Sequence, residues 1–258
     1  MLIAIAGKGG VGKTTLTAAL TRLLQSMGAK NFCVVDADPV GVLGRLLGVE
    51  NRPSVAQSAD HLEGMDTGWT RPLFYDGLLV PLPEGGHLLR MGYPKSPGCF
   101  CRVNGLTKLV IAHVRDRFPI VLMDNEAGLE HVTRGTSEGV DQLILVADKS
   151  RAALEVARET LETARSIGQL RGQAYLVVRG GSIAEDRHSA IDRAAEEMGL
   201  PNPHWLPNDE RIAEAQMTGE PLPAFSEEIA LYSAVRELAM KSILVRGERG
   251  GNNVVRKL

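Results

Sequence analysis

Residues 2–15 read LIAIAGKGGVGKTT, a short apolar strand followed directly by a glycine-rich loop. Gly7, Gly12, Lys13 and Thr14 satisfy the spacing G-x-x-x-x-G-K-[ST], with a predicted strand before it and a predicted helix after it. Glycines allow successive backbone N–H groups to turn toward one anion, because no Cβ blocks that conformation or the approach of the anion. The stretch therefore predicts a loop that binds the phosphates of a nucleotide.

The residues of this loop have separate expected roles. Lys13 brings a compact positive charge to the β- and γ-phosphates and is a candidate catalytic residue. Thr14 offers a hydroxyl to Mg²⁺, and the helix that follows presents the positive end of its dipole to the phosphates. The residues expected to contact the nucleotide here are Gly9, Gly10, Val11, Gly12, Lys13, Thr14 and Thr15.

The apolar runs after the loop predict an α/β protein with a doubly wound, mostly parallel sheet and helices on both faces. The expected strands are 32–35, 118–124, 142–147 and 174–179, and the expected helices include 184–198 and one within 222–245. Two short strands at 78–80 and 87–91 are expected to pair as a hairpin or at an edge. A helix after Cys101 has the predicted apolar face Val103, Leu106, Leu109, Val110 and Val114.

Length and composition favour one domain. The chain has 258 residues and a formal net charge of -2, and 44% of its residues are hydrophobic, which is enough for one substantial core. We expect a single nucleotide-binding domain over 1–245 with a small insertion around 51–98. The stretch 51–76 has no clear pattern, and the tail 246–258 is expected to be disordered.

The composition also bears on partners and location. The chain has no basic run, so nucleic acid is not an expected partner. No apolar segment approaches the length of a membrane span, and the first apolar run stops at Gly7 without an export signal. Three cysteines do not make a disulfide framework, so we expect a reducing cytoplasm, with Cys33 as a small core residue.

Two of the predicted strands end in acidic residues. Asp36 and Asp38 follow the strand at 32–35, and Asp124 ends the strand at 118–124. Ligands of open α/β sheets bind at the carboxyl ends of the strands, so Asp36 and Asp124 are predicted to hold Mg²⁺, partly through water. For the pair Asp36 and Asp38, orienting the water that attacks the γ-phosphate is a second possible role. A helix cap is the alternative for one of the two.

A Cys-x-Cys pair, Cys99 and Cys101, lies just before a predicted helix. The helix dipole favours thiolate there, which makes the pair a candidate for binding a soft metal. Two thiolates are too few for a closed tetrahedral site. A twofold homodimer that places its two pairs face to face would supply four. A chance pairing of two unrelated cysteines is the alternative.

The nine residues GKGGVGKTT at 7–15 resemble the deviant Walker A motif of the MinD, ParA and nitrogenase iron protein superfamily. The resemblance implies a nucleotide-dependent homodimer in which Lys8 reaches the phosphates held by the partner subunit and takes part in catalysis. The string D-A-D-P after the second strand resembles switch I, which would make Asp38 the residue that positions the attacking water. The string E-A-G would be switch II, with the backbone N–H of Gly128 near the γ-phosphate.

A narrower resemblance runs from residue 1 to about residue 240. The string Arg90-Met-Gly, the Cys99-x-Cys101 pair and EAGLEHVTRGT at 126–136 resemble the CooC family, ATPases that assist nickel insertion into carbon monoxide dehydrogenase. The resemblance implies binding of ATP/ADP with Mg²⁺, nickel or zinc bound by Cys99 and Cys101 at a homodimer interface, and carbon monoxide dehydrogenase as the client.

One position departs from the pattern of the relatives. Where they carry an asparagine that contacts adenine, near the end of the strand at 174–179, this chain has Val178. Selection of the base would then depend on backbone groups, for which the region of Pro207 and Asp209 is the candidate.

Two other functions remain open. The same four thiolates would hold a [4Fe–4S] cluster in an electron carrier like the nitrogenase iron protein, although that protein uses two well-separated cysteines. A positioning ATPase of the ParA or MinD kind would explain the phosphate-binding loop and leave the cysteine pair without a role.

Overall fold

The structure is a computed structural model that describes residues 1–38, 41–49, 54–60, 76–92, 100–126, 139–180 and 185–244. For 59–60, 100–107 and 185–189 it describes the backbone alone. The predictions for Cys99, Gly128, most of 51–76 and the tail 246–258 fall outside these ranges. Cys101 lies in a helix, and its side chain is one of those not described.

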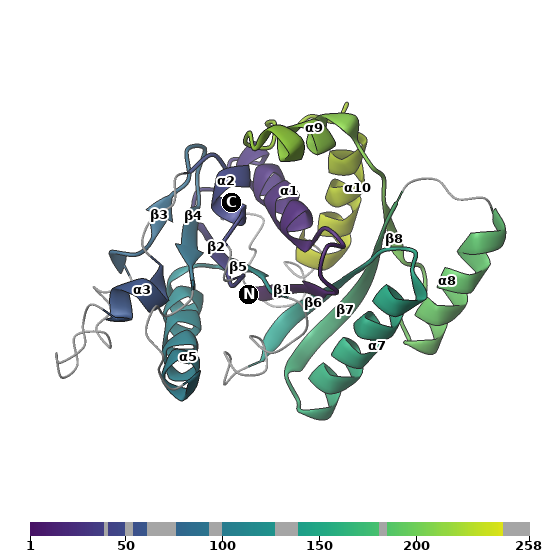
Figure 1. Ribbon diagram of the computed structural model, residues 1–258, viewed down its shortest axis with the longest axis horizontal. Coiled ribbons are helices and arrows are strands. Elements are labelled where there is room, and N and C mark those ends of the chain that lie inside the picture. The colour runs from purple at the N-terminus through teal and green to yellow at the C-terminus, as the bar shows by residue number, and fades with distance from the viewer. Residues whose placement is uncertain are drawn as a thin grey trace.

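One eight-stranded sheet forms the centre of the molecule, with the strand order β3-β4-β2-β5-β1-β6-β7-β8 (Figure 1). Neighbouring strands run parallel, except that β3 and β4 pair antiparallel. The strands are β1 (Leu2–Gly7), β2 (Phe32–Asp36), β3 (Val80–Pro81), β4 (His87–Arg90), β5 (Ile120–Asp124), β6 (Val140–Ala147), β7 (Leu170–Arg179) and β8 (His204–Leu206). The predicted fold class and the predicted edge pair are confirmed.

Helices cover both faces of this sheet. They are α1 (Lys13–Ser26), α2 (Leu43–Leu46), α3 (Val55–Asp60), α5 (Phe100–Arg117), α7 (Arg151–Ser166), α8 (Glu185–Glu197), α9 (Glu210–Thr218) and α10 (Ala230–Ala239), the last continued by a π-helical turn over Met240–Leu244. Helices α1 and α10 pack together on one face, and α5 and α7 lie on the other (Figure 1). None of the described helices is both long and apolar enough to cross a lipid bilayer.

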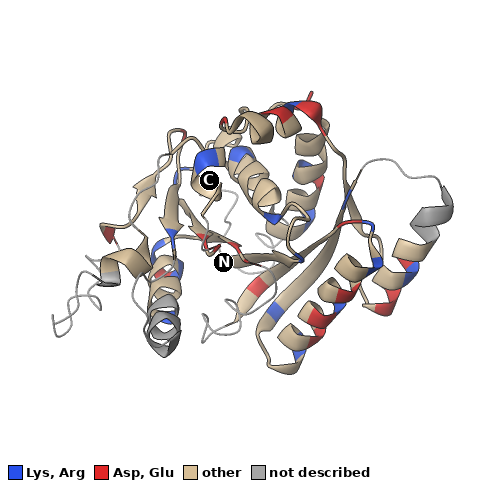
Figure 2. Ribbon diagram, in the orientation of Figure 1, with Lys and Arg blue, Asp and Glu red and all other residues tan. Residues whose placement is uncertain are grey.

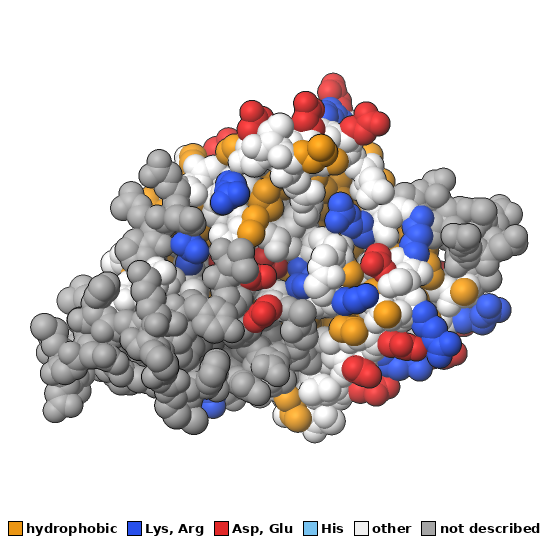
Figure 3. All heavy atoms as spheres, in the orientation of Figure 1, with side chains coloured by type: hydrophobic (Ala, Val, Ile, Leu, Met, Phe, Trp, Pro, Cys, Tyr) orange, Lys and Arg blue, Asp and Glu red, His pale blue; other side chains and the backbone are white. Residues whose placement is uncertain are grey.

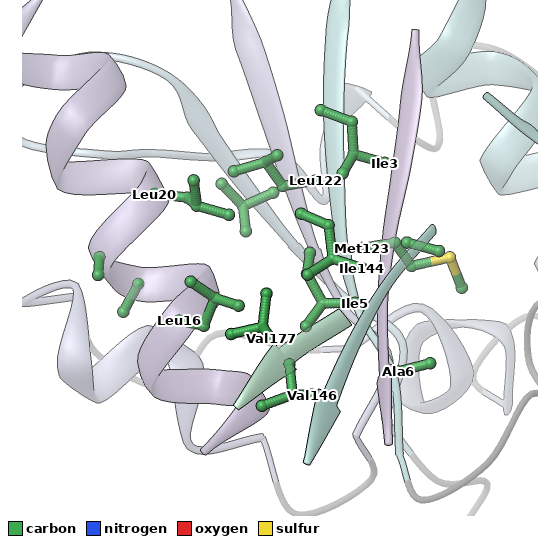
Figure 4. Close-up of a cluster of buried hydrophobic side chains, with 14 of the residues drawn as sticks. Ile3, Ile5, Ala6, Leu16, Leu20, Leu122, Met123, Ile144, Val146 and Val177 are labelled. Atoms are coloured by element: carbon green, nitrogen blue, oxygen red, sulfur yellow. The ribbon is translucent and has the colours of Figure 1, made fainter. Parts of the chain in front are cut away.

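The core follows from the apolar runs of the central strands. All six residues of β1 are buried, as expected for a parallel strand covered on both faces. Figure 4 shows Leu16 and Leu20 of α1 pointing at side chains of the sheet, among them Leu122 and Val177. This packing fixes the start of α1, and therefore the loop before it, against the carboxyl ends of the strands.

Two parts of the prediction need correction or addition. The apolar face predicted for α5 included Leu109, which is 43% exposed, whereas Val110 and Val114 are fully buried. Val110 and Val114 belong to the buried stripe of α5, and Leu109 lies at the edge of that stripe. Strand β8 and helix α9 were not predicted; β8 has three residues, too few to show a clear alternation.

Candidate nucleotide-binding site

The loop between β1 and α1 has the conformation that an anion-binding turn needs. Gly7 and Gly12 have φ angles of 148° and 99°, which side-chain-bearing residues rarely adopt. A Cβ on Gly7 would also lie 2.1 Å from the carbonyl oxygen of Val146 in β6. Gly12 is the N-cap of α1, and the first turn of this helix has neither a side-chain cap nor an acidic residue. Its first N–H groups are therefore available for a phosphate.

Lys13 is held over this loop in the first turn of α1. Its side chain is 8% exposed, and its ammonium donates to the carbonyl oxygen of Lys8 at 3.1 Å. Burial lowers the pKa of Lys13, and the carboxylates of Asp124 and Asp38 act in the opposite direction. A positive charge thus lies between the loop and the acidic strand ends, where a γ-phosphate would need it.

Asp36 and Asp124 stand side by side at the carboxyl ends of β2 and β5, where the strand register pairs them directly. Burial, and then the charge of Asp124, raise the pKa of Asp36 to about 7. Burial also raises the pKa of Asp124 to about 6, although hydroxyls of Thr14 and Thr17 donate to it. The Thr17 bond measures 3.3 Å to Oδ1. The Oδ2 atom of each aspartate is buried and has no hydrogen-bond partner in the described part of the chain.

This arrangement fits a divalent cation. Two buried carboxylates and the Thr14 hydroxyl converge beside the phosphate-binding loop, and oxygen atoms of these kinds are the ligands that Mg²⁺ takes in proteins. The raised pKa values show that the two carboxylates are costly to ionise without a nearby positive charge. Figure 2 shows acidic positions at this sheet edge near the start of α1. In the same view, Figure 3 shows acidic and basic side chains close together near the middle of the molecular surface.

Arg90 extends the row of charges by one strand. The register places Arg90 of β4 beside Asp36, and its charge opposes the rise in the pKa of that carboxyl. The guanidinium also lies against Gly41, where an added Cβ would be 2.2 Å from Nη2. Arg90 thus connects the Asp36 carboxylate with the segment that follows β2. The Arg90-Met-Gly string pointed to this position, without indicating its neighbours.

Asp38 follows β2, and Lys8 belongs to the loop itself. The backbone N–H of Asp38 donates to Asp36 Oδ1 at 3.3 Å, which ties the predicted water-positioning residue to a predicted magnesium ligand. Lys8 is exposed. Hydrogen bonds from Ser150, and then the charge of Lys8, lower the pKa of Asp148. This exposure of Lys8 is compatible with its predicted reach toward a second subunit.

A cavity of about 310 Å³ continues from the loop toward β8. Its walls include Val11, Gly12, Thr15, Arg179, Leu206, Pro207, Asn208, Asp209 and Ile212. Val178 is fully buried, so its side chain does not reach this space. Pro207 and Asp209 line the cavity as expected, but the Asp209 carboxylate caps α9 and accepts from the backbone N–H groups of Arg211 and Ala230 at 3.0 and 3.1 Å.

Sequence reasoning missed several residues around the site. Thr17 lies one turn after Lys13, on the same face of α1, and its hydroxyl donates to Asp124. Because Lys13 was already expected near the acidic strand ends, this helical spacing was the available signal for Thr17. Asn125 is 1% exposed and donates from its side chain to the carbonyl oxygen of Ile5 at 3.0 Å, joining the ends of β5 and β1. Arg179 ends β7 and lies over the loop, a contact for which the sequence carries no signal.

The predicted soft-metal site falls at the edge of the described residues. Cys99 lies outside the described residues, and of Cys101 the backbone alone is placed, in the first turn of α5. Within the described ranges, no group of three or more His, Cys, Asp or Glu side chains forms a metal site. Cys33 is buried in β2, where burial raises the pKa of its thiol, as expected for a core residue.

Known proteins are similar to this chain in sequence and in fold. The family profile of the CobQ/CobB/MinD/ParA nucleotide binding domain matches residues 2–222. An uncharacterized ATP-binding protein of Methanocaldococcus jannaschii is 32% identical over 94% of this chain and 98% of its own. The carbon monoxide dehydrogenase accessory protein CooC of Rhodospirillum rubrum is 34% identical over 65% of this chain and 70% of its own.

Solved structures agree on the fold. The septum site-determining protein MinD of Pyrococcus horikoshii, complexed with Mg-ADP, has a TM-score of 0.68 to this chain, with 22% identity over 93% of this chain and 94% of that one. The broader of the two resemblances is therefore confirmed, and so is the prediction of an ATPase at the level of the family. With a profile match over most of its length and a phosphate-binding loop in the matching place, this chain belongs to the CobQ/CobB/MinD/ParA family of nucleotide-binding ATPases.

Proposed function

We propose that this protein is a Mg²⁺-dependent ATPase that works as a homodimer and delivers nickel to carbon monoxide dehydrogenase. The observation that carries the ATPase part is the buried pair of Asp36 and Asp124 beside Lys13. The nickel part is supported by the Cys99-x-Cys101 string in the sequence, of which Cys101 lies in the first turn of α5, and by the 34% identity to an accessory protein of carbon monoxide dehydrogenase.

The nucleotide would lie along the carboxyl edge of the sheet. Its phosphates would bind the N–H groups of the loop and of the first turn of α1, and its base would enter the cavity beside Pro207. Thr14 and Asp124, with Asp36 through water, would hold the cation. When bound, Mg²⁺ neutralises negative charge on the β- and γ-phosphate oxygens.

The chain's own residues would then serve hydrolysis by position and charge. Lys13 would hold the γ-phosphate oxygens, and Asp38 would orient the water whose oxygen attacks the γ-phosphorus as the bond to the β–γ bridging oxygen breaks. The products are ADP and inorganic phosphate. The bond from the Asp38 N–H to Asp36 would keep the water-positioning segment in register with the cation site. Lys8 of each subunit and the N–H of Gly128 would add contacts to the γ-phosphate.

One helix–strand unit would connect the nucleotide with the cysteine pair. Helix α5 begins at Phe100, beside Cys101, and packs on β5, which ends at Asp124. A shift of β5 on nucleotide binding would therefore move the start of α5 as well. In a twofold dimer this movement would bring the two Cys-x-Cys pairs together or apart and so couple hydrolysis to metal release.

Metal analysis of anaerobically purified protein tests this function. With and without ADP, we expect about one nickel or zinc ion per dimer, because four thiolates complete one tetrahedral site. The double variant Cys99→Ser, Cys101→Ser should lose the metal, and the control Cys33→Ala should keep it because Cys33 is a buried core residue. Full metal binding by the double variant would refute the proposal, and a brown, reducible iron protein would support the [4Fe–4S] alternative.

A second candidate is a positioning ATPase, favoured by the likeness of the fold to the MinD structure. Such a protein would bind a membrane surface or DNA when loaded with ATP and would need no cysteine ligands. Co-sedimentation with anionic liposomes or with DNA, in ATP against ADP, separates the two functions. Activation of carbon monoxide dehydrogenase by nickel, with and without this protein, tests the proposed client directly.

A further inference from the structure

The first half of β7 borders a cavity, whereas its second half borders a neighbouring strand. In the described part of the chain, β7 pairs with β6 from Leu170 onward, but β8 pairs only with Val177, Val178 and Arg179. Residues 170 and 172–176 of β7 line a cavity of about 490 Å³, and its walls also include residues 199–202, which lead into β8. We call this cavity the edge groove, because it follows the edge of β7 on the side of β8.

The side chains around the edge groove are basic. Arg165 belongs to the last turn of α7, and its Nη1 donates to the carbonyl oxygen of Met198 at 3.2 Å. Lys241 lies in the π-helical turn after α10, and its backbone carbonyl accepts from the hydroxyl of Tyr175 at 3.1 Å. His204 of β8 is a further lining residue. None of the described residues that line the groove is an aspartate or a glutamate.

The charge of Lys241 acts inside the groove. Burial, and then Lys241, lower the pKa of His204, whereas Glu237 acts in the opposite direction. His204 is therefore neutral near pH 7, and the full positive charges that line the groove are those of Arg165 and Lys241. These two charges favour a ligand that carries carboxylates or other anionic groups.

The strand edge and the two cations together favour one kind of ligand. The edge of a strand presents N–H and C=O groups in a row, and an extended peptide can pair with them as an added strand. Helices α7 and α10 lie on opposite faces of the sheet, so Arg165 and Lys241 approach the edge of β7 from opposite sides. Successive side chains of an added strand point to these two faces in turn. An acidic peptide can therefore pair its backbone with β7 and place carboxylates near both cations.

We propose that the edge groove binds an extended acidic peptide of a partner protein, which adds to the sheet as a strand next to residues 170–176 of β7. Seven extended residues span roughly 23 Å, so a partner segment of about seven residues fills the groove. The inference does not rest on the proposed function. Among the described residues, the edge groove and the cavity beside the phosphate-binding loop have no lining residue in common.

Fluorescence anisotropy with a labelled heptapeptide tests the site. The probe is Glu-Glu-Val-Thr-Val-Glu-Glu, blocked at both termini, in which each pair of neighbouring glutamates presents one carboxylate to each face. It should bind at least tenfold more tightly than the same peptide with lysine in place of every glutamate. Hydrogen exchange of backbone amides within residues 170–176 should slow when the acidic peptide binds. Absence of binding, or equal affinity for the two peptides, would overturn the inference.

Methylation of the probe's backbone separates strand addition from attraction between charges. The N–H groups of alternate residues point to the same edge of a strand, so methylating the odd-numbered amides blocks one edge and methylating the even-numbered amides blocks the other. Only one edge of the peptide faces β7. One of the two methylated peptides should therefore lose binding while the other keeps it. Equal binding of the two, whether retained or lost, would contradict pairing with β7.

The double variant Arg165→Gln, Lys241→Gln should weaken binding of the acidic peptide at least tenfold, with ATP hydrolysis unchanged because both residues lie outside the nucleotide site. The matched control is Arg151→Gln, Arg193→Gln, which removes two positive charges from exposed positions of α7 and α8 outside the groove lining. It should bind like the wild-type protein, and each variant should unfold cooperatively. Wild-type affinity in the first double variant, or displacement of the peptide by a short single-stranded DNA, would overturn the inference.

Discussion

The two halves of the nucleotide site are built in different ways. The phosphate half consists of the loop before α1 and the row Asp124, Asp36 and Arg90, and its acidic members are buried and aligned by the strand register. The base half is a cavity of about 310 Å³, whose walls include residues of β7, α9 and the segment between β8 and α9. The first half holds charges that are costly to bury, and the walls of the second include the half-buried Arg179. We therefore expect the effects of substitutions in the two halves to differ in size and in kind.

The largest effect should come from Lys13→Ala. Removing the ammonium takes away the charge that faces the γ-phosphate, so hydrolysis measured by phosphate release should fall at least about a hundredfold. Lys30→Ala is the control, because the Lys30 ammonium donates to the carbonyl oxygen of Glu84 at the exposed surface. Wild-type hydrolysis by Lys13→Ala would show that the buried charge in the phosphate half is not needed for hydrolysis.

An intermediate effect should come from Asp36→Asn, through the pH dependence of stability. The pKa of Asp36 is raised in the folded state to about 7, so its contribution to folding is fully present below about pH 4 and is lost as the pH rises to 7. Without Mg²⁺, the wild-type melting temperature should therefore fall between pH 5 and pH 8 more than that of the variant. Mg²⁺ with nucleotide should restore it at pH 8 in the wild-type protein.

Asp116→Asn serves as the control for that measurement, because Asp116 is exposed on α5. It should follow the wild-type pH profile. Equal slopes for wild-type protein and Asp36→Asn would show that the buried pair does not carry the charge cost assigned to it.

The smallest effect should come from Asp209→Ala in the base half. Loss of the cap of α9 should lower the free energy of unfolding by about 1 kcal/mol, which shifts the melting temperature by roughly 2–4 °C for a chain of this size. Asp209→Asn should unfold near the wild-type temperature, because asparagine caps helices as well as aspartate does. If Asp209→Asn lowered the melting temperature as much as Asp209→Ala, the negative charge of Asp209, and not its capping of α9, would be what stabilises the fold.

How far the site could be predicted differs between the halves. The phosphate half was predictable because its residues lie next to one another in the chain or at the ends of apolar strands, and both features are visible in a linear string. Thr17 and Arg90 were missed as contacts of the aspartates, since neither position belongs to the loop pattern. Leu109 was assigned to a buried face because helical periodicity does not show where the buried stripe ends.

The base half could not be predicted in the same way. The prediction drew attention to Val178, which is buried in the core, whereas its neighbour on β7, Arg179, lies in the cavity wall together with Pro207 and Asp209. Successive residues of a strand point to opposite faces, so a change of one position exchanges a core side chain for one that faces the cavity. Contact of Asp209 with the base stays a prediction, and its role as a helix cap depends on α9, which the sequence did not reveal.

By itself, the sequence determined the strand, loop and helix that hold phosphates, the acids at two strand ends and the class of fold, because these depend on local conformation and on periodicity. Tertiary structure alone decided that Asp36 lies between Asp124 and Arg90, because strands distant in the chain become neighbours only through the order of the sheet. It also decided that Arg179 lies over Gly12, since that contact joins the end of β7 to a loop formed by the first residues of the chain.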